Sequence, residues 1–183
     1  MKRYIAVVAL IISGIASVSA QEIKWMTMDE AVAAQKKSPK KIFMDVYTVW
    51  CGPCQMLDRN TFKNKDVAEY VNKNFYAVKF NGEGNEVVNY KGQKFENPNY
   101  DPARKNSRNG VHHFAAALGV QAYPTMMFFD EEANPIFPIS GYLKPSQIEL
   151  YLKLAANEDY KKFKTNDDFK KYQSEFKGSF KDN

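Results

Sequence analysis

The chain contains two cysteines, Cys51 and Cys54, separated only by Gly52 and Pro53. Such a pair can be a structural disulfide, part of a metal site, or a redox reagent. A disulfide across so short a loop removes little conformational entropy from the unfolded chain, so stabilisation is a weak reason for it. A structural zinc site needs four ligands, and the two histidines of the chain are adjacent to each other and distant in sequence. The spacing therefore favours a redox reagent, and no metal or other cofactor is expected.

Cys51 is placed where a buried strand gives way to a helix. Residues 41–49 are rich in β-branched and aromatic side chains and apolar on both faces apart from Asp45, as in a central strand. The residues after Cys54 have helical spacing. A thiol at a helix N-terminus meets unpaired N–H groups and the positive end of the helix dipole, which favour the thiolate. Cys51 is thus the expected attacking thiol, and Cys54, one turn later, the resolving thiol.

The rest of the chain alternates helical and strand patterns. A capping box formed by Thr27 and Glu30 opens one expected helix, and Ser146 with Glu149 has the same pattern before another. A hairpin with Lys91 and Gly92 at its turn is expected between them. This alternation predicts an α/β fold with a mixed central sheet flanked by helices. Helices are expected at residues 28–37, 66–74, 111–118 and 146–156, and further strands at 75–80, 125–129 and 136–140.

Trp50-Cys51-Gly52-Pro53-Cys54 after a hydrophobic strand resembles the active site of thioredoxins. The resemblance covers about residues 23–156 and implies a thioredoxin fold. Within the superfamily, the sequence is more similar to exported thioredoxin-like proteins of bacterial envelopes, near the C-terminal domain of the transmembrane thiol:disulfide interchange protein. In this motif Gly52 permits close approach of a substrate, and Pro53 fixes the first helical turn.

The resemblance assigns further site residues. Asp45 stands where thioredoxins have a buried aspartate, which would take the Cys54 proton, and Lys79 stands where they have its lysine partner. The alternatives are a solvent-exposed aspartate at the strand end and a surface lysine on an edge strand. Tyr123-Pro124-Thr125 resembles the cis-proline loop that pairs with substrate backbone, although most X–Pro bonds are trans.

Trp50 is expected at the substrate surface, with core packing as the alternative. Three features depart from ordinary thioredoxin. Gln55 replaces a usual lysine, which removes a positive charge that would favour the Cys51 thiolate. Arg59 replaces the proline that kinks the active-site helix, and the insertion at residues 81–109 has no thioredoxin counterpart. These departures affect the expected reduction potential and the set of partners.

The first twenty residues have the form of a secretory signal peptide. Lys2 and Arg3 precede a short apolar run, and Ala20 suits cleavage before Gln21. A membrane anchor is the competing interpretation, but the run is shorter than the roughly 20 apolar residues that a spanning helix needs. The protein is therefore expected in a periplasm or outside the cell, with no membrane anchor after cleavage. An oxidising compartment also suits a cysteine pair that cycles through a disulfide.

Length and charge limit the remaining possibilities. Residues 21–183 suit a single domain, expected as a thioredoxin-like domain at 21–157 with a charged C-terminal extension at 158–183. Two of the five excess positive charges belong to Lys2 and Arg3, and the others are mixed with acidic residues. No nucleic-acid binding is expected. The extension is expected to be a helix or a loose tail, and His112 and His113 to be surface or partly packed residues.

These observations predict an exported thiol:disulfide oxidoreductase that is a monomer and acts on disulfide-containing proteins. Gly-Pro between the cysteines resembles the reducing end of the superfamily, so a reductase kept reduced by a membrane electron donor is favoured. One alternative is a disulfide oxidase or isomerase. The other is a binding module that uses the insertion for recognition, and in that case the cysteines are secondary. The insertion is expected to form a lid or a partner surface near the cysteines.

Overall fold

A computed structural model describes residues 22–182, so the expected signal peptide at 1–20 lies outside the described residues. Its centre is a five-stranded sheet with the order β1-β3-β2-β6-β7. The first three strands in this order are parallel, whereas β6 is antiparallel to β2 and β7 is antiparallel to β6. The mixed sheet expected from the sequence is confirmed. The strands are β1 (Trp25–Met26), β2 (Lys41–Tyr47), β3 (Phe75–Asn81), β6 (Thr125–Phe129) and β7 (Pro135–Ser140).

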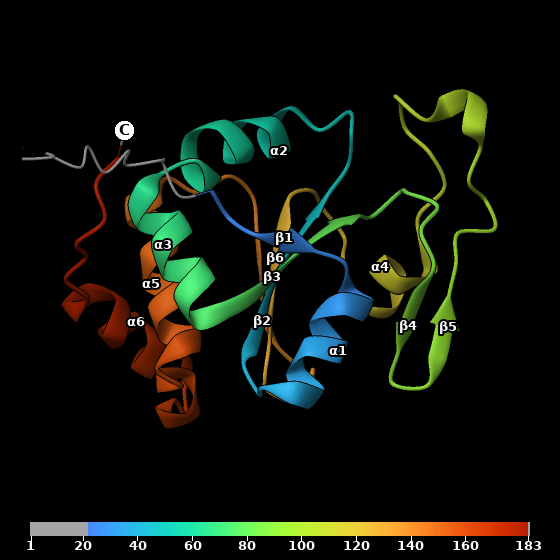
Figure 1. The fold of residues 1–183 in the computed structure, drawn as a ribbon. Helices are drawn as coiled ribbons and strands as arrows, with labels where there is room; N and C mark the ends of the chain where they lie inside the picture. The colour runs from blue at the N-terminus through green and yellow to red at the C-terminus, as the bar shows by residue number, and fades with distance from the viewer. Residues whose placement is uncertain (1–21, 183) are drawn as a thin grey trace, which may run out of the picture.

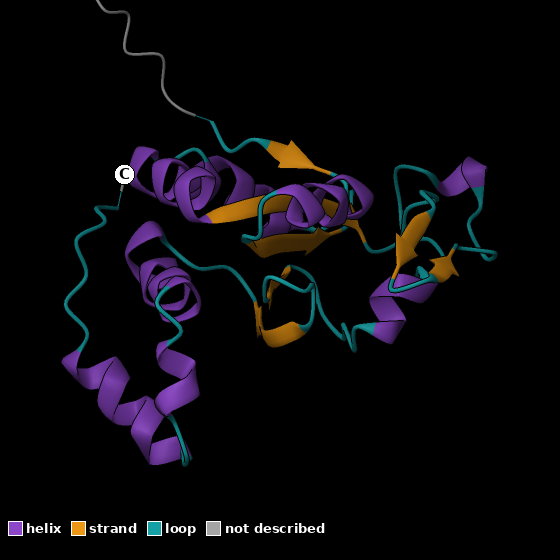
Figure 2. Ribbon diagram, turned by 60° about the horizontal axis from the view of Figure 1, so that its bottom comes forward, coloured by secondary structure: helices purple, strands orange, loops and turns teal. Residues whose placement is uncertain are grey.

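Helices cover both faces of this sheet (Figure 1; Figure 2). One face is covered by α1 (Met28–Lys37), α4 (His113–Ala117) and the hairpin of β4 (Val88–Tyr90) and β5 (Gln93–Phe95). The other face is covered by the π-helical turn η1 (Asp58–Phe62), α3 (Lys65–Asn74) and α5 (Pro145–Ala156). The short helix α2 (Gly52–Leu57) runs directly into η1.

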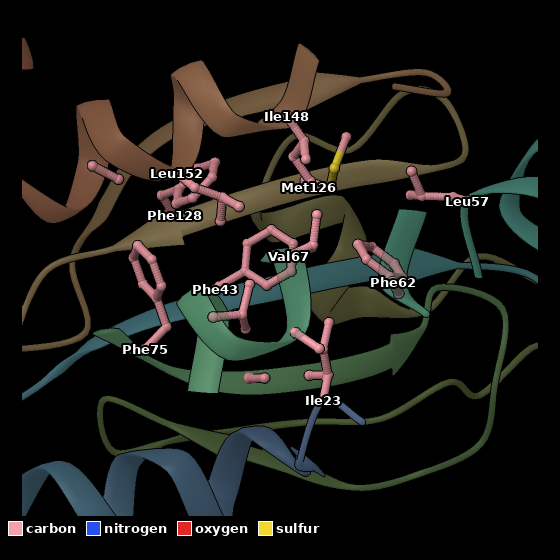
Figure 3. Close-up of a cluster of buried hydrophobic side chains, with 14 residues drawn as sticks. Ile23, Phe43, Leu57, Phe62, Val67, Phe75, Met126, Phe128, Ile148 and Leu152 are labelled. Carbon is pink, nitrogen blue, oxygen red and sulfur yellow. The ribbon is translucent and has the colours of Figure 1, made fainter. Parts of the chain in front are cut away.

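The two hydrophobic cores follow from the alternation of side chains along β2. Phe43 packs with residues of η1, α3, β6 and α5, as Figure 3 shows. Ile42, Met44 and Val46 point to the opposite face and pack under α1 and α4. Full burial of each such side chain contributes about 1.5–3 kcal/mol. Asp45 shares the face of Phe43 and therefore points toward the side that carries α2 and η1.

Strand β2 ends at Tyr47, two residues earlier than predicted. The backbone N–H of Cys51 donates to the carbonyl of Thr48 at 3.2 Å, which closes a turn, and the N–H of Gly82 binds the carbonyl of Tyr47 at 2.8 Å. These two bonds replace continued pairing in the sheet. The turn brings Cys51 to the start of α2, so the expected strand-to-helix junction is confirmed.

The insertion folds as a hairpin followed by a loop. Lys91 and Gly92 form the turn between β4 and β5 with φ angles of 51° and 78°, as expected for a two-residue hairpin turn. The loop that follows contains the single turn η2 (Pro102–Arg104) and returns to α4. In Figure 1 this loop rises at the same end of the sheet as the start of α2.

His112 is fully buried, so the expectation of a surface or partly packed residue was wrong for it. Its Nδ1 accepts the backbone N–H of Phe114 at 3.0 Å, and its Nε2 donates to the carbonyl of Glu86 at 2.8 Å. The ring also lies edge-on to Phe80. Burial lowers the pKa of His112. This cap explains why α4 begins at His113 rather than at Val111.

The expected capping box of Ser146 and Glu149 is wrong, because α5 begins one residue earlier, at Pro145, with Lys144 as its cap. Glu149 instead binds the C-terminal extension, which contains η3 (Asp159–Lys162) and α6 (Asn166–Glu175). Its carboxylate accepts the backbone N–H groups of Ser179 and Phe180 at 2.7–2.8 Å. The last described residues are therefore docked on the domain. No helix within residues 22–182 is both long and apolar enough to cross a membrane.

Candidate active site

Cys51 and Cys54 form a disulfide at the start of α2, with their Cα atoms 5.3 Å apart. Cys51 is the N-cap residue, and its Sγ accepts the backbone N–H of Cys54 at 3.1 Å. The two cysteines are only 3% and 1% exposed, and Cys51 is the more exposed of the pair. The N–H that points at Cys51 Sγ would stabilise a thiolate at this atom in the reduced protein.

The two residues between the cysteines lie at the surface, with free space around Gly52. Gly52 and Pro53 are both exposed, and a Cβ added to Gly52 would meet no atom within 4 Å. Pro53 occupies the first turn of α2, where its missing N–H costs no hydrogen bond. Gln55 is also exposed, and its amide donates to the carbonyl of Val49 at 3.4 Å. A neutral side chain thus stands where a cation would favour the thiolate.

The Tyr123–Pro124 peptide bond is cis, as expected from the resemblance. Pro124 is buried, and its carbonyl accepts the N–H of Gly141 at 2.8 Å. Thr125 is buried as well, and its hydroxyl donates to the carbonyl of Ala122 at 2.8 Å. The half-buried ring of Tyr123 lies edge-on to Trp50, with the ring centres 6.3 Å apart. This contact places the cis-proline loop beside the residue that precedes Cys51.

Asp45 is fully buried and paired with Lys79, which stands opposite it in the register of β2 and β3. Lys79 Nζ lies 2.7 Å from Oδ2 of Asp45, whereas Oδ1 is buried and has no hydrogen-bond partner among the described residues. Burial raises the pKa of Asp45 to about 6, although the Lys79 charge opposes the shift. The alternatives, a solvent-exposed aspartate and a surface lysine on an edge strand, are therefore excluded, because Asp45 is fully buried and β3 lies between β1 and β2.

Asp58 is a third member of this cluster that the sequence analysis did not identify. Its carboxylate also pairs with Lys79 Nζ. The exposed fraction rises from 0% at Asp45 through 20% at Lys79 to 42% at Asp58, so the three charges run from the interior to the surface. A cavity of about 330 Å³ opens at Asp58 and Lys79. Asp58 lies four residues after Cys54 on the same helical face, which was the signal available in the sequence.

Comparisons with known proteins identify the family and support the fold. A family model described as a thioredoxin-like domain matches residues 28–156. The chain belongs to the thioredoxin-like family. No curated protein matches the sequence significantly.

Solved structures similar to this thioredoxin-like chain support the fold. A thioredoxin-fold protein from Helicobacter pylori aligns with a TM-score of 0.57 and 18% identity, covering 84% of this chain and 86% of that chain. A candidate disulphide isomerase from Bacteroides thetaiotaomicron aligns with a TM-score of 0.51 and 25% identity, covering 75% of this chain and 95% of that chain. A thioredoxin from Thermus thermophilus aligns with a TM-score of 0.53 and 14% identity, covering 72% of this chain and 85% of that chain.

In this thioredoxin-like protein the insertion reaches the active site at Trp50. The indole Nε1 donates to Oε2 of Glu83 at 2.7 Å, and the backbone N–H of Asn109 donates to the same oxygen at 2.8 Å. The guanidinium of Arg108 lies 4.5 Å from the centre of the Trp50 ring. A Cβ added to Gly82 would lie 2.6 Å from the Tyr123 ring, so a side chain at this position would displace that ring. Both ends of the insertion therefore meet beside Cys51.

The sequence analysis missed Glu83 and Arg108. A partly buried indole N–H needs an acceptor, and this requirement was the one signal available for a carboxylate near Trp50. Nothing in the local sequence pairs Arg108 with that ring. The remaining expected site residues lie around the disulfide or in the Asp45–Lys79 pair. No group of three or more potential metal ligands lies together in the described part of the chain.

Proposed function

We propose that this protein is an exported thiol:disulfide oxidoreductase that reduces disulfide bonds in protein substrates. The observation that carries the proposal is the disulfide between Cys51 and Cys54 at the N-cap of α2, beside the cis-proline loop. Membership of the thioredoxin-like family supports oxidoreductase chemistry at this pair. The proposal goes beyond family membership in three respects: the reducing direction, the export and the partners. These rest on the Gly52-Pro53 pair and on the N-terminus, which has the form of a signal peptide.

In the reduced protein, the Cys51 thiolate attacks one sulfur of a substrate disulfide. A mixed disulfide forms, and the other substrate sulfur leaves as a thiolate. Cys54, once deprotonated, attacks Cys51 Sγ, which forms the Cys51–Cys54 disulfide and releases the second substrate thiolate. Two electrons pass from the protein to the substrate, and the two released thiolates take up protons. A membrane electron donor would return the protein to the dithiol.

Asp45 would accept the proton of Cys54 during this second step. A base is most effective when its pKa lies near the working pH, and burial raises the pKa of Asp45 to about 6. Its Oδ1 is available to take the proton, because only Oδ2 is paired with Lys79. Asp58 would hold the other side of the Lys79 ammonium, so that Lys79 keeps a partner when Asp45 becomes neutral.

A trapping experiment tests the reaction and identifies substrates. In a Cys54→Ala protein, Cys51 can attack but the mixed disulfide cannot be resolved, so covalent complexes should accumulate in the producing cells and release their partners on reduction. The matched control is the Cys51→Ser, Cys54→Ala protein, which should trap nothing. Equal trapping by both proteins, or the absence of any trapped species, would contradict the proposal.

The direction is tested by equilibrating the protein with glutathione. The reducing function predicts a potential toward the thioredoxin end of the range, about −270 mV, whereas about −120 mV would indicate an oxidase. The 25% identity to the candidate disulphide isomerase favours isomerisation as a second candidate function. That activity would appear as reactivation of a protein with scrambled disulfides. The binding-module alternative predicts that Cys51→Ser leaves the cellular function intact.

Export is tested separately from the chemistry. The proposal expects the mature protein in the periplasm or medium to begin at Gln21, which mass spectrometry of the protein from its natural host would reveal. A mature protein that keeps Met1 and the apolar run would contradict cleavage, whatever the redox result.

A further inference from the structure

The end of the insertion carries an exposed cluster of positive charge. Arg104, Lys105 and Arg108 are exposed, and none of them forms an ion pair with another residue in the described range 22–182. The single carboxylate among residues 101–108 is Asp101, whose Oδ1 accepts the backbone N–H of Ala103 at 2.9 Å and so caps η2. This segment, residues 101–108, is called the basic loop below.

The basic loop is anchored at its C-terminal end beside the redox pair. Arg108 lies over the Trp50 ring at 4.5 Å, and the next residue, Asn109, shares Oε2 of Glu83 with the Trp50 indole. Trp50 directly precedes Cys51 in the chain. Because Glu83 is only 8% exposed, its carboxylate is a fixed internal anchor. The other two cations, Arg104 and Lys105, lie three to four residues earlier in the same exposed loop.

We propose that the basic loop binds acidic residues that flank the disulfide of a protein substrate. The inference rests on the proposed function, and it adds the class of substrate that this site prefers. Trp50 directly precedes Cys51 and Arg108 lies over the Trp50 ring, so the chain next to a disulfide that reaches Cys51 passes close to Arg108. A guanidinium stacked on a ring has already lost conformational freedom, so less entropy is lost when a carboxylate binds it.

Charges at the rim of an interface act mainly on the association rate and its salt dependence. Arg104 and Lys105 would therefore attract an acidic segment before the sulfur atoms meet, and repel a basic one. This pair is also suitable for substitution, because both side chains are exposed and free of ion pairs with residues 22–182. Their replacement should leave the fold and the disulfide in place.

The test uses three synthetic peptides that share one disulfide and differ only in the residues flanking it, which are two aspartates, two asparagines or two lysines. The second-order rate constant for oxidation of the reduced protein is measured for each peptide by stopped flow. The wild type should react about tenfold faster with the acidic than with the basic peptide at low salt. In 1 M salt the preference should largely vanish, because the Debye length falls to about 3 Å.

The informative variant is Arg104→Glu/Lys105→Glu, in which the preference between the acidic and basic peptides should be lost or inverted. The matched control is Lys164→Glu/Lys177→Glu, which changes the net charge equally on exposed lysines of the C-terminal extension. Figure 1 and Figure 2 place this extension at the opposite end of the molecule from the insertion. The control should keep the wild-type preference.

The outcomes separate this inference from the proposed function. Equal wild-type rates with all three peptides would overturn the substrate preference and leave the redox function standing. Loss of preference in both variants would also overturn it, because the effect would then come from net charge alone. If the wild type reduces none of the peptides, the proposed function itself fails.

Discussion

The charge state of Asp45 affects the stability of the fold. Its carboxyl group is fully buried, and the ammonium of Lys79 faces it. Burial raises the pKa of Asp45 to about 6, so the loss of water outweighs the attraction of Lys79. A carboxyl group held in this way changes its charge just below neutral pH. The folded state tolerates the ionised form only at a cost.

The cost of burying the ionised carboxylate leads to a prediction for Asp45→Asn. Because the folded-state pKa is raised above the unfolded value, the protonated form of Asp45 favours the fold. That stability is present below about pH 4 and is lost as pH rises through about 6. Removing the charge should therefore raise the free energy of unfolding of the oxidised protein at pH 8 by about 2–3 kcal/mol. Urea unfolding at pH 4 and pH 8 measures the difference.

The control for this substitution is Asp167→Asn, because the Asp167 side chain is 85% exposed. It should change the unfolding free energy little at either pH, since exposed ion pairs contribute about 0–1 kcal/mol. An Asp45→Asn protein whose stability follows the wild type in parallel between pH 4 and pH 8 would show that Asp45 does not titrate in this window.

At the scale of elements, three separate segments meet at the Trp50 indole. Glu83 follows the end of β3, Asn109 stands at the end of the insertion, and Trp50 lies between β2 and α2. One carboxylate oxygen joins all three. Removing it leaves two N–H groups without their acceptor, which costs about 1–3 kcal/mol for each buried donor that stays unpaired.

Glu83→Ala should therefore release the end of the insertion from the active site. We expect Trp50 emission to shift to longer wavelength, because the ring gains water as Arg108 and Asn109 leave it. The chain has two tryptophans, so the Trp50 signal is the difference from a Trp50→Phe protein. Glu96→Ala is the matched control, because that carboxylate lies in the insertion but pairs with Lys94 on the surface. An unchanged Trp50 spectrum in Glu83→Ala would show that the anchor is dispensable.

Most elements were predicted correctly because their signals are local. The capping box of Thr27 and Glu30 is present, with a backbone bond of 2.8 Å to the Glu30 carboxylate, and Lys91 and Gly92 form the hairpin turn. Ser146 and Glu149 show where a prediction from local sequence fails. The same pattern occurs there, but Glu149 binds residues thirty positions away, and no local spacing encodes that contact.

The site residues likewise divide into those with a signal in the local sequence and those without one. The cysteines, the Asp45–Lys79 pair and the cis bond before Pro124 could be predicted, since each lies at a fixed place relative to a strand or motif. Glu83 and Arg108 could not, because both belong to the insertion and their contacts with Trp50 depend on how that loop folds back. The roles of all these residues in catalysis stay predictions.

At the scale of the whole molecule, the C-terminal extension returns across α5 and ends beside α3. The carbonyl of Lys181 accepts the side-chain amide of Asn64 at 2.9 Å, and the ring of Phe180 lies edge-on to Tyr70. The backbone N–H of Ser146 donates to Oδ1 of Asp182 at 3.0 Å. The extension thus holds the start of α5 and one flank of α3 together, on the side away from the insertion (Figure 2).

Glu149 is the centre of this docking. Burial alone would raise its pKa, but bonds from Lys153, Phe180 and Ser179 outweigh burial and lower it. Because the folded-state pKa is lowered, the stabilisation by Glu149 is present at neutral pH and lost as pH falls through the acid range. Without the extension, the buried carboxylate would keep only the Lys153 ammonium, which lies 2.6 Å away.

Deletion of residues 177–183 should therefore lower the free energy of unfolding at pH 7 by about 2–4 kcal/mol, since a charged buried acceptor loses its backbone donors. The loss should shrink as pH falls through the acid range, where Glu149 becomes protonated. Glu149→Gln in the shortened chain should recover part of it, because a neutral amide is cheaper to bury than an unpaired charge. Disulfide reduction should continue at the wild-type rate, because the described part of this segment bonds to α5 and to residues 64 and 66 rather than to the redox pair. A shortened chain as stable as the full one at pH 7 would mean that the extension contributes nothing to the fold.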